Sequence, residues 1–203
     1  MRRRGFPVLL SGAVLTCVAL CVSAHGQYYP NQSLEIHDLP SLTARTHDPT
    51  DVLLASLDTI LHDRVLCCGK DSALIDSVQA ADPKSLKDIA NKLGGRHLLG
   101  DGRPIQMDTE FLTPDQVVAG HLVAEIVSNR APLMIWNSQL YVVHGIIFAS
   151  SPDYSTGITT YVIQKFLLWD LRYSDTRREV VFDREKEDPG KTQGILFVTL
   201  ARQ

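Results

Sequence analysis

The chemistry in this sequence centres on two adjacent cysteines, Cys67 and Cys68, which are followed directly by Gly69. The segment after Gly69 is predicted to be helical, with Ala73 and Leu74 on its apolar side. A helix N-terminus lowers the pKa of a thiol, because its free N–H groups and its dipole stabilise the thiolate. Cys68 is therefore a candidate nucleophile, and Gly69 leaves room for a substrate backbone. The alternative is that both cysteines are buried packing residues, as free cysteine often is.

Three apolar segments in the second half of the chain have the composition of strands. Residues 131–136 and 140–145 are typical of two paired strands joined by a short turn, and residues 166–170 of a later strand that ends in Asp170. With Cys68 at a helix start, this order resembles the papain-like cysteine peptidases, in particular the bacterial type related to bacteriocin-processing peptidases. The resemblance covers about residues 52–171.

The resemblance implies a role for each of these positions. Cys68 would be the nucleophile, and Asp170 would orient the general base. His62 lies six residues before Cys68, where such peptidases carry the glutamine that helps to form the oxyanion hole. Gly69 and Trp136 would contact the substrate. These roles imply a domain that binds a peptide or protein.

The sequence departs from this family at the general base. The family has a histidine six residues before the strand glycine, and here Gln139 stands six residues before Gly145. A glutamine does not accept a proton near neutral pH, so it cannot generate the thiolate. His144 is the candidate for a displaced base. Because strand side chains alternate, His144 is predicted to point away from the face of Gln139 unless a bulge intervenes, and then to be a hydrogen-bonded histidine under the sheet.

Asp170 has a second interpretation, because Gln139 leaves it no imidazole to orient. It would then be a strand-end carboxylate paired with a nearby arginine, and Arg172, Arg177 and Arg178 are the candidates.

Helical periodicity and capping residues come first along the chain, and strand-like segments come last. This order predicts an α+β fold with an antiparallel sheet, and the resemblance implies a papain-like arrangement with N-terminal helices packed on a C-terminal sheet. Helices are predicted for about residues 50–64, the segment after 69, residues 86–93 and residues 113–129, and strands for residues 132–136, 139–149, 158–171, 177–182 and 194–201.

The N-terminus has the pattern of a secretory signal peptide. Arg2, Arg3 and Arg4 precede an apolar run over residues 6–22, and small residues lead to a predicted cleavage site after Ala24. The sequence thus divides into a signal peptide (1–24), an extended N-terminal arm (25–49) and a papain-like domain (50–203). An uncleaved membrane anchor is the alternative, because the apolar run is at the short limit of a membrane span. If the signal is cleaved, the exported protein keeps no membrane contact.

Composition excludes several other classes of function. The formal net charge is −3, and outside the three arginines of the predicted signal peptide no block of like charges is present, so nucleic acid is not an expected partner. No histidines have zinc-site spacing and no glycine-rich phosphate loop is present, so neither a metal nor a cofactor is expected. The sequence therefore predicts an exported, diverged or inactive cysteine peptidase that binds a peptide or protein. The alternatives are an active cysteine peptidase that uses Cys68, or an unrelated secreted α+β domain whose cysteines are structural or a redox pair.

Overall fold

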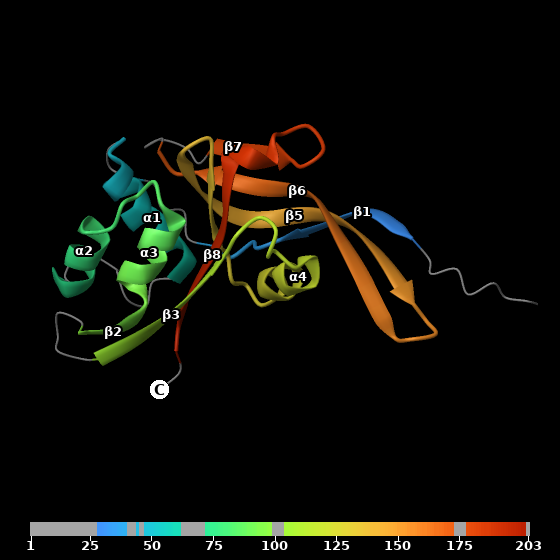
Figure 1. Cartoon of the computed structure of the whole chain (residues 1–203), viewed down its shortest axis with the longest axis horizontal. Helices are drawn as coiled ribbons and strands as arrows, with labels where there is room; N and C mark the ends of the chain where they lie inside the picture. Colours follow the sequence, from blue (N-terminus) through green and yellow to red (C-terminus); the bar gives the residue numbers. More distant parts are fainter. Residues whose placement is uncertain are drawn as a thin grey trace, which may run out of the picture.

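The computed structural model shows an α+β fold built around one antiparallel sheet of eight strands (Figure 1). It describes residues 28–39, 44, 47–61, 72–98, 104–172 and 178–201. The predicted signal peptide, residues 1–24, lies outside these ranges. The α+β class and the antiparallel sheet predicted from the sequence are confirmed.

The strands follow the order β2-β3-β8-β4-β5-β6-β7, and β1 pairs with the second half of β5. The outer parts of β5 and β6 form a hairpin that extends away from the body of the molecule, with β1 beside β5 (Figure 1). The strands are β1 (Tyr29–Glu35), β2 (Gly95–Leu98), β3 (Pro104–Leu112), β4 (Leu133–Trp136), β5 (Gln139–Asp153), β6 (Ile158–Asp170), β7 (Arg178–Asp183) and β8 (Thr192–Leu200).

The helices form two separate groups on the sheet. Helices α1, α2 and α3 contact one another and form one layer, whereas α4 lies apart from them and contacts β1, β5 and β6 (Figure 1). Within the described part of the chain, no helix is long and apolar enough to cross a membrane. The helices are α1 (Pro49–Leu61), α2 (Ser72–Gln79), α3 (Leu86–Leu93) and α4 (Ala119–Val127), with a short 3-10 helix, η1 (Pro189–Lys191).

The two groups cover opposite faces of the sheet. The Thr109 hydroxyl of β3 donates a hydrogen bond of 3.1 Å to the Ala90 carbonyl of α3, and Thr109 pairs with Val198 of β8. Phe197 directly precedes Val198 in β8. Its ring packs edge-on against His121 of α4, with 5.3 Å between the ring centroids. Adjacent residues of a strand point to opposite faces. Thr109 and Phe197 therefore mark opposite faces of the sheet. We call the face covered by α1, α2 and α3 the helix-layer face and the other the α4 face.

Apolar side chains between the helix layer and the sheet make up most of the core. Helix α3 shows how the sequence produces this packing: Ser85 caps its N-terminus by accepting a hydrogen bond of 3.2 Å from the Asp88 amide. Its apolar residues then recur at helical spacing and are buried, as the sequence predicts. Fully buried side chains of this layer and of the strands include Leu53, Leu57, Leu86, Ile89, Leu93, Leu133, Val142 and Leu196.

The prediction that all strands follow the helices is wrong for β1, β2 and β3. Part of the expected N-terminal arm is strand β1, whose side chains are mostly exposed. It pairs through its backbone with β5 and carries little apolar patterning that a sequence analysis could detect. Strands β2 and β3 form a hairpin at one edge of the sheet, where partial burial weakens the alternation of apolar and polar residues.

The predicted helix over residues 113–129 is too long, because α4 begins only at Ala119. The Thr113 hydroxyl donates to the Asp115 carboxylate at 2.6 Å, and the Gln116 amide donates to the Thr113 carbonyl at 2.9 Å. Such local side-chain bonds favour a turn over a helix. The residues from Thr113 to Gln116 therefore form a turn that precedes α4.

Candidate functional site

The structure describes four of the seven predicted site residues. Cys68, Gly69 and His62 lie outside the described residues. The other four are on the central strands and their ends: Trp136 on β4, Gln139 and His144 on β5, and Asp170 on β6.

The turn between β4 and β5 places Trp136 and Gln139 side by side. Asn137 and Ser138 both have positive φ angles, 51° and 59°, so they form the tight turn that matches the twist of a two-residue hairpin. Trp136 and Gln139 are paired across this hairpin. The Tyr141 hydroxyl donates a hydrogen bond of 2.8 Å to Gln139 Oε1, and the Tyr141 and Trp136 ring centroids are 5.9 Å apart.

These side chains lie on the α4 face. Tyr141 pairs with Met134, and Met134 pairs with Ile195 of β8. Ile195 and Phe197 are two residues apart in one strand and therefore share a face. Gln139, two residues before Tyr141, belongs to the same face.

Asp170 is held by an arginine, and by no histidine of the described part of the chain. Its side chain is buried, and its two carboxylate oxygens accept hydrogen bonds from the guanidinium of Arg172, from Nε at 2.8 Å and from Nη2. The Arg172 amide donates a further bond of 3.2 Å to Asp170 Oδ1. The guanidinium also lies over the Tyr141 ring, with Cζ 5.9 Å from the centroid. Arg172, one of the three arginines that the sequence offers, thus pairs with Asp170, and Arg177 lies outside the described residues.

Five residues are connected by contacts, and we call them the strand-end cluster. Asp170 binds Arg172, Arg172 lies over Tyr141, and Tyr141 contacts both Gln139 and Trp136. The Trp136 Nε1 atom is buried and has no hydrogen-bond partner among the described residues. The cluster comprises Trp136, Gln139, Tyr141, Asp170 and Arg172.

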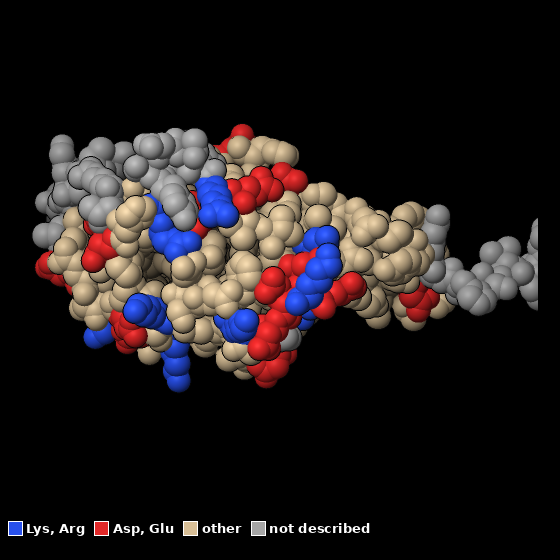
Figure 2. Space-filling view, turned by 90° about the horizontal axis from the view of Figure 1, so that it is seen from above, with Lys and Arg blue, Asp and Glu red and all other residues tan. Residues whose placement is uncertain are grey.

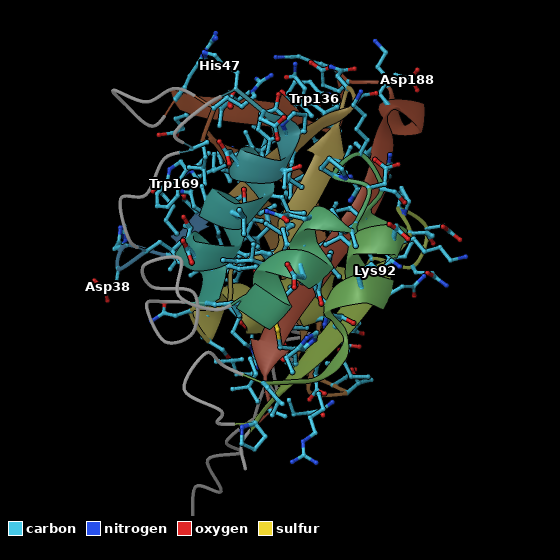
Figure 3. The ribbon with its side chains drawn as sticks, turned by 90° about the vertical axis from the view of Figure 1, so that its left-hand side faces the viewer. Asp38, His47, Lys92, Trp136, Trp169 and Asp188 are labelled. Carbon is cyan, nitrogen blue, oxygen red and sulfur yellow. The ribbon has the colours of Figure 1, made fainter. Side chains whose placement is uncertain are left out.

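His144 does not belong to this cluster. Its ring stacks on Trp169, with 4.5 Å between the centroids and 14° between the planes, and its side chain is buried. Trp169 pairs with Val142, whose side chain faces the helix layer because Tyr141 faces α4. His144 therefore points away from Gln139, as the alternation predicts, although the pairing register shifts between Val143 and Gly145. Figure 3 shows Trp169 on the side of α1 and Trp136 at the upper end of the sheet.

Comparison with known protein families, curated proteins and solved structures finds no match to this chain.

The strand-end cluster can bind a ligand, but it holds no group that transfers a proton easily near neutral pH. The Gln139 amide accepts from Tyr141, and the Asp170 carboxylate is occupied by Arg172. No imidazole of the described residues contacts Asp170. General-base activation of a thiol needs an acceptor with a suitable pKa within hydrogen-bond reach.

Two further histidines are explained by packing. His97 lies in β2, and its Nε2 is 2.8 Å from the Leu93 carbonyl oxygen. His121 is 3.3 Å from the Glu110 carboxylate and packs on Phe197. Across the described ranges, no group of three or more His, Cys, Asp or Glu side chains could hold a metal ion.

A small pocket adjoins the cluster through Phe182. The Phe182 ring meets Trp136 edge-on at 5.2 Å and also forms part of the pocket wall. The pocket has a volume of about 50 Å³ and opens on the α4 face, beneath the turn that precedes α4. Its lining is Pro114, Val117, Met134, Phe166, Phe182, Arg184, Thr192, Gly194 and Ile195.

Sequence analysis did not identify Tyr141, Phe182 or this pocket. Tyr141 could have been found, because strand alternation places it on the face of Gln139. Phe182 and the pocket could not, because they depend on the close approach of strands far apart in the sequence.

Proposed function

We propose that this chain is an exported, diverged papain-like domain that binds a peptide or protein and has lost the proton-transfer chemistry of a cysteine peptidase. The observation that carries this proposal is the pairing of Asp170 with Arg172. In a peptidase of this type the carboxylate orients an imidazole, and here a guanidinium takes both of its oxygens.

Gln139 supports the same proposal. In the position that the resemblance assigns to the general base, its side-chain oxygen accepts a hydrogen bond from Tyr141. An amide in that position orients neighbouring groups but does not remove a proton from a thiol. His144 does not replace it, because its buried ring stacks on Trp169 on the other face of β5.

Retention of binding is supported by what the cluster still offers. Trp136 supplies a half-buried aromatic ring that packs against the buried Tyr141, and Arg172 supplies a side chain that is 24% exposed. Side chains of this kind are enriched where proteins bind peptides and other proteins. The adjoining pocket gives the same face a concave region.

The proposal is tested with the exported chain and fluorogenic peptide substrates. We expect no hydrolysis above that of the Cys68→Ala variant, together with slow alkylation of Cys68 by iodoacetamide at neutral pH. Hydrolysis by the natural chain that Cys68→Ala abolishes would show an active peptidase. An unreactive Cys68 in a chain that binds none of a panel of peptides would favour an unrelated domain with structural cysteines.

A gain-of-function variant tests the missing base directly. Gln139→His restores the residue type that the family has at this position, and we expect turnover that Cys68→Ala again abolishes. General-base catalysis is typically worth about 10²–10⁴-fold, which sets the upper range of the gain. The double variant Gln139→His/Arg172→Gln should gain more, because Asp170 is then free to orient the new imidazole. If both variants hydrolyse the peptides no faster than Cys68→Ala does, the assignment of Gln139 to the base position is wrong.

A further inference from the structure

The pocket on the α4 face is apolar except at one place. Met134, Phe166 and Phe182 line its wall, and the rings of Phe166 and Phe182 are 5.9 Å apart. Among the described residues that line it, Arg184 is the only charged one, and Thr192 adds a hydroxyl. An apolar wall with a single cation fits a ligand group that is apolar with one negative charge beside it.

The backbone of Arg184 is anchored next to this pocket. Its amide donates a hydrogen bond of 3.0 Å to the Gln164 carbonyl, which fixes the backbone where β7 ends. The neighbouring carboxylate, Asp183, lies 3.4 Å from Lys165 and 3.4 Å from Lys186. Burial tends to raise the pKa of Asp183, but hydrogen bonds from the Glu185 amide and from these two lysines hold that pKa below its usual value.

Among the described residues, no carboxylate therefore forms an ion pair with the Arg184 guanidinium. Arg184 is exposed at the pocket, where an incoming carboxylate can reach it. A guanidinium binds a carboxylate through two parallel hydrogen bonds, which a neutral amide cannot reproduce.

The volume of the pocket limits the apolar group that it can hold. A cavity needs roughly 10–15 Å³ for each water-sized group. The volume of about 50 Å³ therefore corresponds to a few carbon atoms. A space of this size favours a small branched aliphatic side chain, such as that of valine, leucine or isoleucine.

We propose that this pocket holds the C-terminal residue of a bound peptide, with an aliphatic side chain against Met134 and Phe182 and the free carboxylate on Arg184. This inference rests on the proposed peptide-binding function and adds the part of the peptide that is recognised. A carboxylate next to a branched aliphatic side chain is what distinguishes a C-terminal leucine from an internal one.

The first test uses Met134 as a reporter inside the pocket. The chain has three methionines, Met1, Met107 and Met134, and Met107 is buried at the helix-layer side of β3. In protein labelled with ¹³C at the methionine methyl groups, 4-methylpentanoate should shift the Met134 signal in a saturable way and leave Met107 unchanged. The neutral analogue 4-methylpentanamide should need at least about fivefold higher concentration, as expected for the loss of one charged hydrogen bond.

The second test uses peptides and two matched arginine variants. Fluorescein-labelled pentapeptides end in leucine carboxylate, in leucine carboxamide or in alanine carboxylate, and fluorescence anisotropy measures their Kd. We expect the leucine carboxylate to bind about 5- to 10-fold more tightly than either of the others. Arg184→Gln should remove the difference between carboxylate and carboxamide, whereas Arg96→Gln, on the distant strand β2, should preserve it.

The outcomes separate this inference from the function on which it rests. If peptides bind but carboxylate and carboxamide are equal and Arg184→Gln has no effect, the pocket assignment is wrong and the peptide-binding proposal stands. If no peptide binds and Met134 does not respond to 4-methylpentanoate, both are overturned. A Val117→Phe variant, which fills the pocket from its rim, should abolish the Met134 response without loss of fold.

Discussion

At the scale of single residues, the electrostatics of the strand-end cluster depend on Asp170. Its side chain is almost fully buried, and Arg172 supplies two side-chain hydrogen bonds and one backbone hydrogen bond to its oxygens. A buried carboxylate is stable only when such partners replace the water that it has lost. The pair is therefore a structural unit, and removing either charge leaves the other in a poorly hydrated place.

Replacing Asp170 by asparagine should lower the free energy of unfolding by about 2–4 kcal/mol, because Arg172 then has no anion to compensate its partly buried charge. Urea denaturation measures the change. Asp108→Asn, at an exposed position of strand β3, is the control and should change the stability by less than about 0.5 kcal/mol. Equal effects of the two substitutions would show that the buried ion pair adds nothing specific.

A second residue-scale prediction concerns Asp153 at the tip of the β5–β6 hairpin. The Ser155 hydroxyl and amide donate hydrogen bonds of 2.6 and 2.9 Å to its carboxylate, and they hold the pKa of Asp153 below its usual value. Because the pKa is lower in the folded state, the ionised carboxylate stabilises the turn at pH values above the unfolded-state pKa. This stabilisation is lost as the pH falls through the folded-state pKa. NMR titration of the Asp153 carboxyl should show the low pKa, and Ser155→Ala should raise it. An unchanged pKa in Ser155→Ala would assign the shift to another group.

At the scale of elements, the sequence predicts best where the pattern is local. Helix α3 is correctly predicted because its cap, Ser85, and its apolar spacing all lie within the segment itself. Strand β1 is missed because it is a strand only through backbone pairing with β5, which lies more than a hundred residues further along the chain. The same distinction holds for the site. Alternation along β5 correctly separates His144 from Gln139, and Arg172, only two residues after Asp170, is among the partners that the sequence offers for this carboxylate. The pocket, in contrast, depends on how strands far apart in the sequence meet. The papain-like assignment and the role of Cys68 stay predictions.

Gly145 is the residue that lets β1 approach β5 closely. A Cβ atom there would lie 2.8 Å from the Leu34 carbonyl oxygen and 3.1 Å from a methyl carbon of Leu167, so the backbone of β1 would have to move. Gly145→Ala should therefore destabilise the protein by about 1–3 kcal/mol and lower the hydrogen-exchange protection of the β1 amides.

Gly120→Ala is the matched control for this substitution. A Cβ atom at Gly120 would meet only the Tyr161 ring, at an ordinary distance of 3.5 Å, and Gly120 lies in helix α4. Alanine favours a helix over glycine by up to about 1 kcal/mol, so Gly120→Ala should be neutral or stabilising. A loss of β1 protection in this variant as well would show that the strand responds to any change in the neighbouring α4 layer.

At the scale of the whole molecule, the sheet separates two environments. The helix-layer face carries the large core and His144, and the α4 face carries the strand-end cluster and the pocket. Over the face that Figure 2 shows, acidic and basic side chains are interspersed, as suits a chain with a formal charge of −3. The candidate binding groups therefore lie on the side of the sheet opposite the layer of α1, α2 and α3.

Strand β1 should be part of the folding unit, although the sequence analysis placed residues 25–49 outside the domain. Its backbone pairs with β5 from Tyr29 to Glu35, and the Ile36 amide continues the contact with a hydrogen bond of 2.8 Å to the His144 carbonyl. Removing it exposes the edge of β5 and the buried side chain of Ile36.

A chain that begins at Ile36 should therefore be at least about 2 kcal/mol less stable than one that begins at Tyr28, since each lost backbone hydrogen bond contributes about 1 kcal/mol and several are lost. It should also aggregate at lower concentration, because an uncovered strand edge pairs with other chains. Thermal unfolding and light scattering measure the two effects. The chain that begins at Tyr28 keeps all of β1 and should match one that begins at His25. If the shorter chain is as stable and as soluble as the other two, the domain begins after β1, as the sequence alone predicted.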